Sequence, residues 1–357
     1  MKAIKCIVTI LAVALSATAW GQQNNDQKNA YAGYFECRAI AEYNTHEWTP
    51  TQEAIDSTCY LLGVNLGLTL KDNGFFESFE QMNLNEFEEG IKTAISAGEP
   101  SVTYGIDHDW ASQFKISPYD MSPIFEDFLT ARKEGREIPV KNSWDVCYLW
   151  GVNYGIMLQS NDFFDSIEHV NMLEFIEGLD AGLLSGAPAS TTEEDTEWAS
   201  NFRISPYQMN RVLNDFLAVR REYKKMLNGF TEDYFLIVNA KREGVKETES
   251  GLQYILHSEG EGGKVIPTDH VAVNYTGYFL DGTEFDSSQN AEFVANQVIK
   301  GWTEGLGLVG VGGKVTLFIP SHLAYGENGI RLIEPNTLLV FDVEVLSIEH
   351  NTLENAE

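Results

Sequence analysis

The spacing of apolar side chains changes once along the chain. Through the first two thirds they recur every three or four residues, as Leu61, Val64 and Leu68 do, which is the period of an amphipathic helix. From about Ser250 the spacing becomes an alternation, and residues 271–275 have the period of two that is typical of a strand. We therefore expect a helical region followed by a small antiparallel sheet, which is an α+β architecture.

The alternating region also contains the turn signal that a small sheet needs. An Asp-Gly pair at 281–282 separates two alternating runs, and this pair is a strong indicator of a hairpin. Residues 315–319 and 338–345 are further predicted strands, and 298–308 is a predicted short helix. We therefore predict, at 248–350, an antiparallel sheet wrapped on one short helix.

The helical region contains an internal repeat. Residues 59–129 align with residues 147–217 at a constant offset of 88 without a gap, and 34 of the 71 positions are identical. Two copies indicate a tandem duplication rather than a solenoid, which usually needs three or more units. We place helical repeat 1 at 35–135 and helical repeat 2 at 136–227.

The last helix of the second copy continues beyond the repeat. Its apolar residues alternate by three and four over three heptads: Met209, Val212, Phe216, Val219, Tyr223, Met226 and Phe230. An Asn-Gly pair at 228–229 leaves a bend or interruption open. In the first copy the pattern stops at Gly135 and Pro139, so only the second copy is expected to end in a long helix. We place a connecting helix at 228–247.

The first residues have the features of a targeting segment. Lys2 and Lys5 precede an apolar run, Cys6–Leu15, that is short for a bilayer span, and residues 17–19 have the small-x-small pattern of a cleavage site. We predict a signal peptide at 1–21, with an uncleaved anchor as the alternative. No later stretch approaches 18 consecutive apolar residues, so we expect no integral membrane span and an exported location, either periplasmic, associated with the cell envelope or secreted.

Composition narrows the classes of function. The chain has 24 Lys and Arg against 53 Asp and Glu, for a formal net charge of −29. A surface this acidic repels phosphate backbones, so we expect no nucleic-acid partner. The seven histidines do not have the spacing of a metal site, and we expect neither a metal nor a cofactor.

Three cysteines follow the predicted signal peptide: Cys37, Cys59 and Cys147. Three cannot form a disulfide framework. A single bridge could form, with Cys37 and Cys59 as the pair nearest in sequence. The alternative is that all three are small, buried apolar side chains.

Five short blocks follow one another in the last third of the chain. They are VNYTG at 273–277, DGTEFDSS at 281–288, VIKGWTEG at 298–305, LAYG at 323–326 and LVFDV at 339–343. In this order they resemble the FK506-binding-protein (FKBP) family of peptidyl-prolyl cis-trans isomerases.

The helical copies are similar to the N-terminal domain of one bacterial subgroup of that family, the Mip/FkpA-like proteins. The similarity lies in the block LGVNLG at 62–67 and the block ISPYQM at 204–209. In that subgroup two chains interlock their helical domains, and a long helix carries the FKBP domain. The resemblance thus implies either a homodimer or a monomer in which the two copies form an intrachain pseudo-dimer.

The resemblance also implies a substrate pocket. Trp302 would form its floor under the proline ring, and the Tyr325 hydroxyl and the Ile299 N–H would donate to substrate carbonyls. Asp286 would orient the substrate at the rim. The walls would be Tyr275, Phe285, Val298, Ile299 and Phe341, and an apolar flap would consist of Ile330, Leu332 and Ile333.

A pocket of this kind suits proline isomerisation without a nucleophile, metal or cofactor. The barrier to rotation about an X–Pro bond is about 20 kcal/mol, because the planar amide is stabilised by resonance. The twisted amide is less polar than the planar one, so a dry aromatic pocket favours the twisted form relative to water. The function implied by the resemblance is a peptidyl-prolyl cis-trans isomerase that assists the folding of exported proteins and also has chaperone activity. The expected partners are proline-containing unfolded or exported polypeptides, and FK506-like macrolides. A non-catalytic peptide-binding chaperone, or an envelope interaction protein, is the alternative.

The sequence departs from the family pattern in two places. Residues 289–297 form a segment that is shorter than usual, and within it Phe293 is expected to replace a pocket aromatic. The Arg that commonly follows the block at 281–288 is missing, which deprives Asp286 of its usual partner.

Overall fold

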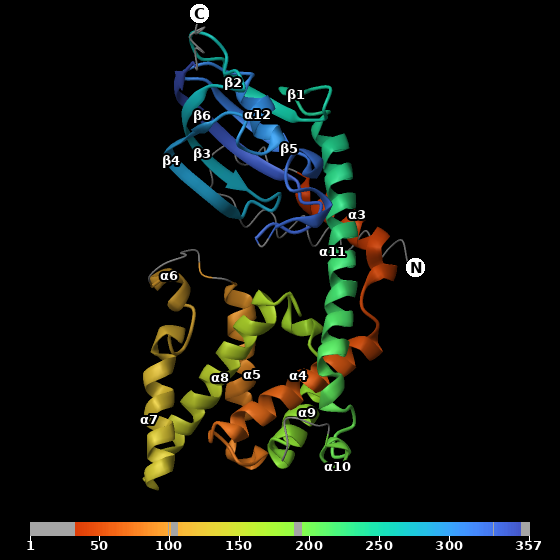
Figure 1. Ribbon diagram of the computed structural model, residues 1–357, viewed down its shortest axis with the longest axis vertical. Helices are drawn as coiled ribbons and strands as arrows, with labels where there is room; N and C mark the ends of the chain where they lie inside the picture. The colour runs from red at the N-terminus through yellow and green to blue at the C-terminus, as the bar shows by residue number, and fades with distance from the viewer. Residues whose placement is uncertain (1–32, 99, 101–105, 189–194, 331, 351–357) are drawn as a thin grey trace, which may run out of the picture. The chain divides into compact units, whose positions relative to one another are not determined.

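The computed structural model describes residues 33–98, 100, 106–188, 195–330 and 332–350 (Figure 1). The predicted signal peptide lies outside these residues. The chain divides into two compact units, a helical unit from Pro50 to Arg220 and a C-terminal unit that combines the described residues up to Thr49 with those from Arg221 onward. The predicted α+β architecture, helical first and antiparallel sheet second, is confirmed.

The helical unit consists of the two sequence copies. The first contributes α4 (Gln52–Asp72), α5 (Leu84–Ala97), α6 (His108–Ala111) and α7 (Met121–Glu134), and the second contributes α8 (Val140–Ser160), α9 (Met172–Ser185), α10 (Thr196–Ala199) and the start of α11 (Met209–Asn239). Equivalent helices begin in the same way. Asn83 caps α5 and Asn171 caps α9, each by accepting a backbone N–H three residues on.

The two copies exchange helices within the chain. Helix α4 packs along α9, and α5 packs along α8, so each pair combines one helix from each copy (Figure 1). The hydroxyl of Tyr60 accepts a hydrogen bond from the Arg203 N–H (2.9 Å), and that of Tyr148 accepts one from the Lys115 N–H (3.0 Å). These two contacts are equivalent under the repeat, and both join one copy to the other. The intrachain interlocking of the copies is therefore present in the fold.

Glycines allow the exchanged helices to approach closely. A Cβ atom on Gly63 of α4 would lie 2.0 Å from the carbonyl oxygen of Phe175 on α9. A Cβ atom on Gly178 of α9 would lie 1.9 Å from the carbonyl oxygen of Tyr60 on α4. Any side chain at either position must therefore push the two backbones apart. This contact gives the α4–α9 pair its close packing.

The C-terminal unit is built on one antiparallel sheet. Its strands are β1 (Val245–Glu247), β2 (Gln253–Ser258), β3 (His270–Tyr278), β4 (Glu284–Val294), β5 (Lys314–Ile319) and β6 (Leu339–Glu349). They lie in the order β1-β2-β5-β6-β3-β4, and every neighbouring pair is antiparallel. The predicted strand alternation is confirmed: along β5, Leu317 and Ile319 enter one core and Phe318, between them, enters another.

Helices cover both faces of this sheet. Helix α12 (Lys300–Leu306) packs on the first face, where Gly301 and Gly305 bring its backbone against Ile319 and Leu317. The second face is covered by α11 and by α3 (Tyr34–Thr45), which buries Cys37. Helix α3 therefore belongs to the C-terminal unit, whereas the sequence placed it in helical repeat 1. Amphipathic spacing indicates that a helix has an apolar face, but it does not indicate which core that face enters.

Helix α11 is continuous through the Asn-Gly pair at 228–229, so the bend left open by the sequence does not occur. It ends at Asn239, and residues 245–247 pair with β2 as strand β1, which corrects the predicted helical connection at 228–247. Gly244, with a φ of 84°, lies in the turn after the helix and directs the chain into strand β1. The predicted three-heptad seam is also only partly buried, because Val219 and Phe230 are exposed.

The three cysteines are free thiols, and each is buried. The interpretation as small apolar side chains is therefore confirmed, and a Cys37–Cys59 bridge is absent from the structure. Burial raises the pKa of the Cys147 thiol to about 11, so it is uncharged at neutral pH. In the described part of the chain, no helix has both the length and the apolarity needed to cross a membrane.

Candidate active site

An aromatic cluster lies where β3, β4, β6 and α12 meet. Alternation along β3 and β6 directs Tyr275 and Phe341 to the face that α12 covers. Trp302 on α12 is buried, and its ring is edge-on to those of Tyr275 (5.1 Å between centroids) and Phe341 (5.2 Å). Phe285, on β4, meets Phe341 edge-on at 5.5 Å. The structure therefore brings four of the predicted pocket residues into one cluster.

Two further aromatic side chains extend this cluster. Phe293 lies 5.5 Å from Trp302 between ring centroids, so the shortened segment at 289–297 still places an aromatic beside the predicted floor. Phe279 lies 4.8 Å from Phe285. Phe279 lies outside the sequence blocks that predicted the site. The available signal was its position just before the hairpin turn that leads to Phe285.

The polar rim of the cluster is centred on Asp286. The Tyr275 hydroxyl donates a hydrogen bond of 2.8 Å to the Asp286 carboxylate, so Asp286 has a hydrogen-bond partner although the Arg is missing. Burial, followed by this hydrogen bond and the carboxylate charge, raises the pKa of Tyr275 to about 12. Burial and the Asp286 charge also raise the pKa of Tyr325. Both hydroxyls therefore stay protonated at neutral pH. The Tyr275 proton is already donated to Asp286, so Tyr325 is the hydroxyl that can donate to a bound carbonyl group.

The other predicted wall residues lie at the start of α12. Ile299 is the N-cap residue of that helix, and both Val298 and Ile299 are half-buried against the same core. An N-cap N–H lies outside the helical hydrogen-bond pattern. The Ile299 N–H is thus free of the helix and can donate a hydrogen bond to a carbonyl oxygen of a bound peptide.

The predicted flap divides into a surface part and a core part. The exposed fractions of Ile330 and Leu332 are 52% and 66%, whereas that of Ile333 is 3%. Ile330 and Ile333 exchange backbone hydrogen bonds of 2.8 and 3.1 Å across a tight turn. The turn directs Ile333 into the core, so only Ile330 and Leu332 present apolar surface. This corrects the expectation of a three-residue flap.

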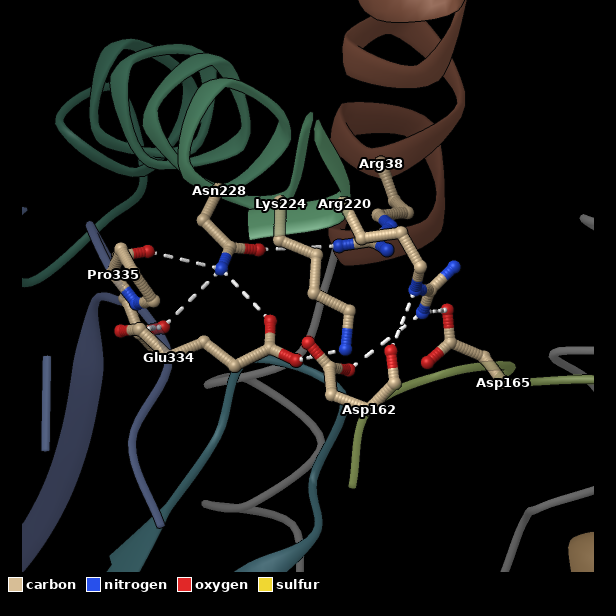
Figure 2. A network of polar contacts seen from close by, with 9 residues as sticks. Arg38, Asp162, Asp165, Arg220, Lys224, Asn228, Glu334 and Pro335 are labelled. Carbon is tan, nitrogen blue, oxygen red and sulfur yellow. Dashed lines mark hydrogen bonds and ion pairs between the residues drawn. The ribbon is translucent and has the colours of Figure 1, made fainter. Parts of the chain in front are cut away.

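Helix α11 holds the loop that follows this flap. The side-chain amide of Asn228 donates to the carboxylate of Glu334 and to the carbonyl oxygen of Pro335, each at 3.0 Å (Figure 2). Lys224, one turn earlier, pairs with Glu334 at 2.7 Å. The Asn336 side chain donates to the Lys225 carbonyl oxygen at 3.1 Å. The long helix therefore fixes one side of the candidate site, which the sequence pattern did not indicate.

A second contact from α11 holds the loop that carries Tyr325. The buried carboxylate of Glu232 accepts the Ser321 backbone N–H (2.7 Å) and the Ser321 hydroxyl (3.1 Å). Burial is the main cause that raises the pKa of Glu232 to about 7, against the lowering effect of the two Ser321 hydrogen bonds. Asp233 raises this pKa further, and His322 lowers it. Glu232 is thus a titratable group within the core.

We expect Glu232→Gln to remove part of the pH dependence of stability. The folded-state pKa of about 7 lies above the ordinary Glu value of 4.5, so the folded protein binds this proton more tightly than the unfolded chain. This contribution is complete below pH 4.5 and is lost as pH rises to 7, by at most about 3 kcal/mol. Denaturant unfolding of both proteins at pH 5 and pH 7.5 measures it. Equal pH dependence in the two proteins would show that Glu232 does not titrate in this range.

The described residues contain no group of three or more His, Cys, Asp or Glu side chains arranged to hold a metal ion. The chemistry available at the site is therefore that of its apolar rings, two phenolic hydroxyls and one carboxylate. These groups can enclose a small apolar ring and donate hydrogen bonds to carbonyl oxygens at its edge.

Comparison with protein-family models identifies the sheet domain. The model of the FKBP-type peptidyl-prolyl cis-trans isomerase matches residues 262–346. The model of the domain amino terminal to FKBP-type peptidyl-prolyl isomerase matches residues 144–256, which contain most of the second helical copy. The antiparallel sheet wrapped on one helix, with an aromatic cluster between them, thus matches an FKBP-type domain.

Curated relatives extend the match over both units. The FKBP-type peptidyl-prolyl cis-trans isomerase FkpA of Aeromonas hydrophila is 43% identical over 178 residues, covering 49% of this chain and 63% of that protein. A probable FkpA of Neisseria meningitidis serogroup B is 49% identical over 206 residues (56% and 72%), and the outer membrane protein MIP of Legionella longbeachae is 36% identical over 185 residues (48% and 73%). The chain belongs to the FKBP-type peptidyl-prolyl cis-trans isomerase family. It spans less than two thirds of the Aeromonas relative.

Proposed function

We propose that this protein is a peptidyl-prolyl cis-trans isomerase that acts in the folding of exported proteins. The observation that carries the proposal is the cluster of aromatic side chains around Trp302, with the hydrogen-bonded Tyr275–Asp286 pair beside it. Membership of the FKBP-type family supports the same activity.

In the proposed mechanism, the substrate proline ring stacks over Trp302 and is enclosed by Phe285 and Phe341. Removal of water favours the twisted amide over the planar, more polar one, which lowers the barrier to rotation. The Tyr325 hydroxyl and the Ile299 N–H hold the carbonyl oxygens on either side of the proline. Asp286 orients the substrate at the rim, and its hydrogen bond from Tyr275 holds it there.

Exchange spectroscopy on a short X–Pro peptide tests the activity directly. The cis and trans forms of such a peptide interconvert in tens to hundreds of seconds without a catalyst. We expect sub-stoichiometric protein to produce exchange cross-peaks, and FK506 to suppress them by competing for the aromatic pocket. A rate equal to that in buffer would reject the enzyme in favour of a non-catalytic, peptide-binding chaperone or envelope interaction protein.

We further propose that the substrates are proline-containing unfolded or exported polypeptides met in the periplasm or at the cell envelope. The predicted signal peptide supports an exported location. The Legionella relative, named as an outer membrane protein, supports it as well. Fractionation of cells that produce the full chain would test the location, and recovery of the protein in the cytoplasm would contradict it.

We propose that the chain is a monomer containing an intrachain pseudo-dimer. The α4–α9 and α5–α8 pairs each already combine both copies, so the helical surfaces used in interlocking are occupied within one chain. Light scattering of the mature protein should give the mass of one chain. A stable two-chain mass would show that helices are exchanged between molecules instead.

A further inference from the structure

The helical unit has an open groove with a volume of about 570 Å³, lined by polar side chains and by a few exposed apolar ones. Residues 80–85, at the start of α5, form one side, and residues 138–144, at the start of α8, form the other. Trp144 and Val140 line it with exposed fractions of 46% and 66%. Large apolar side chains that remain this exposed at a concave surface are typical of sites that bind another molecule.

The repeat supplies an internal comparison for this groove. By the offset of 88, Trp144 is equivalent to Asp56 and Val140 is equivalent to Gln52. Asp56 accepts hydrogen bonds from Gln52 (2.7 Å) and from Asn171 (2.8 Å). At the equivalent surface, polar contacts therefore link the start of α4 to the start of α9. The same local fold is thus compatible with a polar, hydrogen-bonded surface. Val140 and Trp144 are therefore not needed for the two helices to pack in this way.

Charge indicates what the groove can attract. Between Pro50 and Arg220 the sequence has ten Lys and Arg against 28 Asp and Glu. The groove is lined by Glu80 and by no Lys, Arg or His. A hydrogen bond from Ser78 is the main cause that lowers the pKa of Glu80, so this carboxylate is charged at neutral pH. A cationic partner is therefore favoured over an anionic one.

We propose that this groove binds an extended segment of non-native polypeptide, with a bulky apolar side chain against Trp144 and Lys or Arg residues beside it. Tryptophan provides a large, rigid contact area at little entropic cost, which is why it dominates many binding surfaces. The site is distinct from the aromatic pocket of the C-terminal unit. It needs no proline, and its occupation does not depend on the proposed isomerase activity.

A defined peptide tests the groove in the full chain. The probe is a fluorescein-labelled, proline-free peptide with a Phe-Leu-Phe centre and two lysines on each side. Fluorescence anisotropy should detect saturable binding that weakens as salt is raised. The double variant Val140→Gln/Trp144→Asp, which installs the residues of the first copy, should lower the affinity at least tenfold. Leu173→Asn, which removes an exposed apolar side chain on α9, is the matched control and should bind like the wild type.

Other outcomes would overturn the proposal. Equal binding by the wild type and the double variant, or absence of binding by the wild type, would exclude the groove as the site. If the wild type binds a peptide with glutamates in place of the lysines equally well, the groove does not prefer cationic segments. This comparison needs no variant of the protein. Self-association of the wild type that the double variant abolishes would assign the groove to a second copy of the chain. Peptide isomerisation is measured in parallel, and we expect the double variant to retain it.

Discussion

Phe285→Ala is expected to lower kcat/KM for isomerisation of a short proline peptide at least tenfold, which corresponds to about 1.4 kcal/mol of transition-state stabilisation. Phe285 contacts both Phe279 and Phe341 at the edge of the aromatic cluster. Truncation would open the wall of the pocket to water. Water stabilises the planar amide, so the variant would lose the preference for the twisted form on which the proposed mechanism depends.

The measurement compares exchange rates at several peptide concentrations, so that kcat and KM are separated. Phe285 is only half-buried, so the variant is expected to keep its fold, which circular dichroism verifies. Phe230→Ala is the matched control, because Phe230 is an exposed aromatic on α11 outside the cluster. Unchanged catalysis by Phe285→Ala would exclude this residue from the pocket, and an equal loss in both variants would indicate a general effect of losing an aromatic ring.

Gly63→Ala is expected to destabilise the helical unit by about 3 kcal/mol or more. In an exposed helix this change would stabilise by about 1 kcal/mol, because alanine has the higher helix propensity. At Gly63 the expected change in stability has the opposite sign, because the substitution destabilises the fold. The added Cβ would lie 2.0 Å from the Phe175 carbonyl oxygen, and a backbone atom in a packed helix cannot move away as a flexible side chain can.

Hydrogen exchange followed by mass spectrometry locates this effect. Loss of protection should concentrate in α4 (Gln52–Asp72) and α9 (Met172–Ser185), although these helices lie about a hundred residues apart in sequence. Asn65→Ala, on the exposed side of α4, is the matched control and should change stability by less than about 0.7 kcal/mol. Loss of protection in α4 and α5, with α9 still protected, would show that the helices of each copy pair with one another. That result would contradict the exchange of helices between the two copies.

Much of the candidate site could be predicted from the sequence. The blocks at 273–277, 281–288, 298–305 and 339–343 placed Tyr275, Phe285, Trp302 and Phe341 in one pocket, and the structure brings these four together. Their roles remain predictions that the exchange measurements test. The resemblance of these blocks to the FKBP family supplied this grouping, and alternation along β3 and β6 explains why Tyr275 and Phe341 share a face.

Contacts between distant segments could not be predicted in this way. The anchoring of Ser321 by Glu232, and of Glu334 by Asn228, joins residues about a hundred positions apart. A polar residue on a helix has the same local pattern whether it faces water or a buried partner. The inward turn of Ile333 likewise depends on its backbone bonds with Ile330 rather than on hydropathy.

The sequence by itself determined the α+β class, the duplication at an offset of 88, the continuation of the second copy into a long helix, and the aromatic composition of the pocket. Only the tertiary structure decided that the copies exchange helices, that α3 joins the sheet, and that residues at the starts of α5 and α8 line one open groove. The physical reason is that periodicity specifies which face of a helix is buried but not the partner against which it is buried. In a duplicated sequence each helix has two nearly identical candidate partners. The glycines that permit close approach, Gly63 and Gly178, recur as Gly151 and Gly90, so they allow either pairing and the local sequence does not choose between the partners.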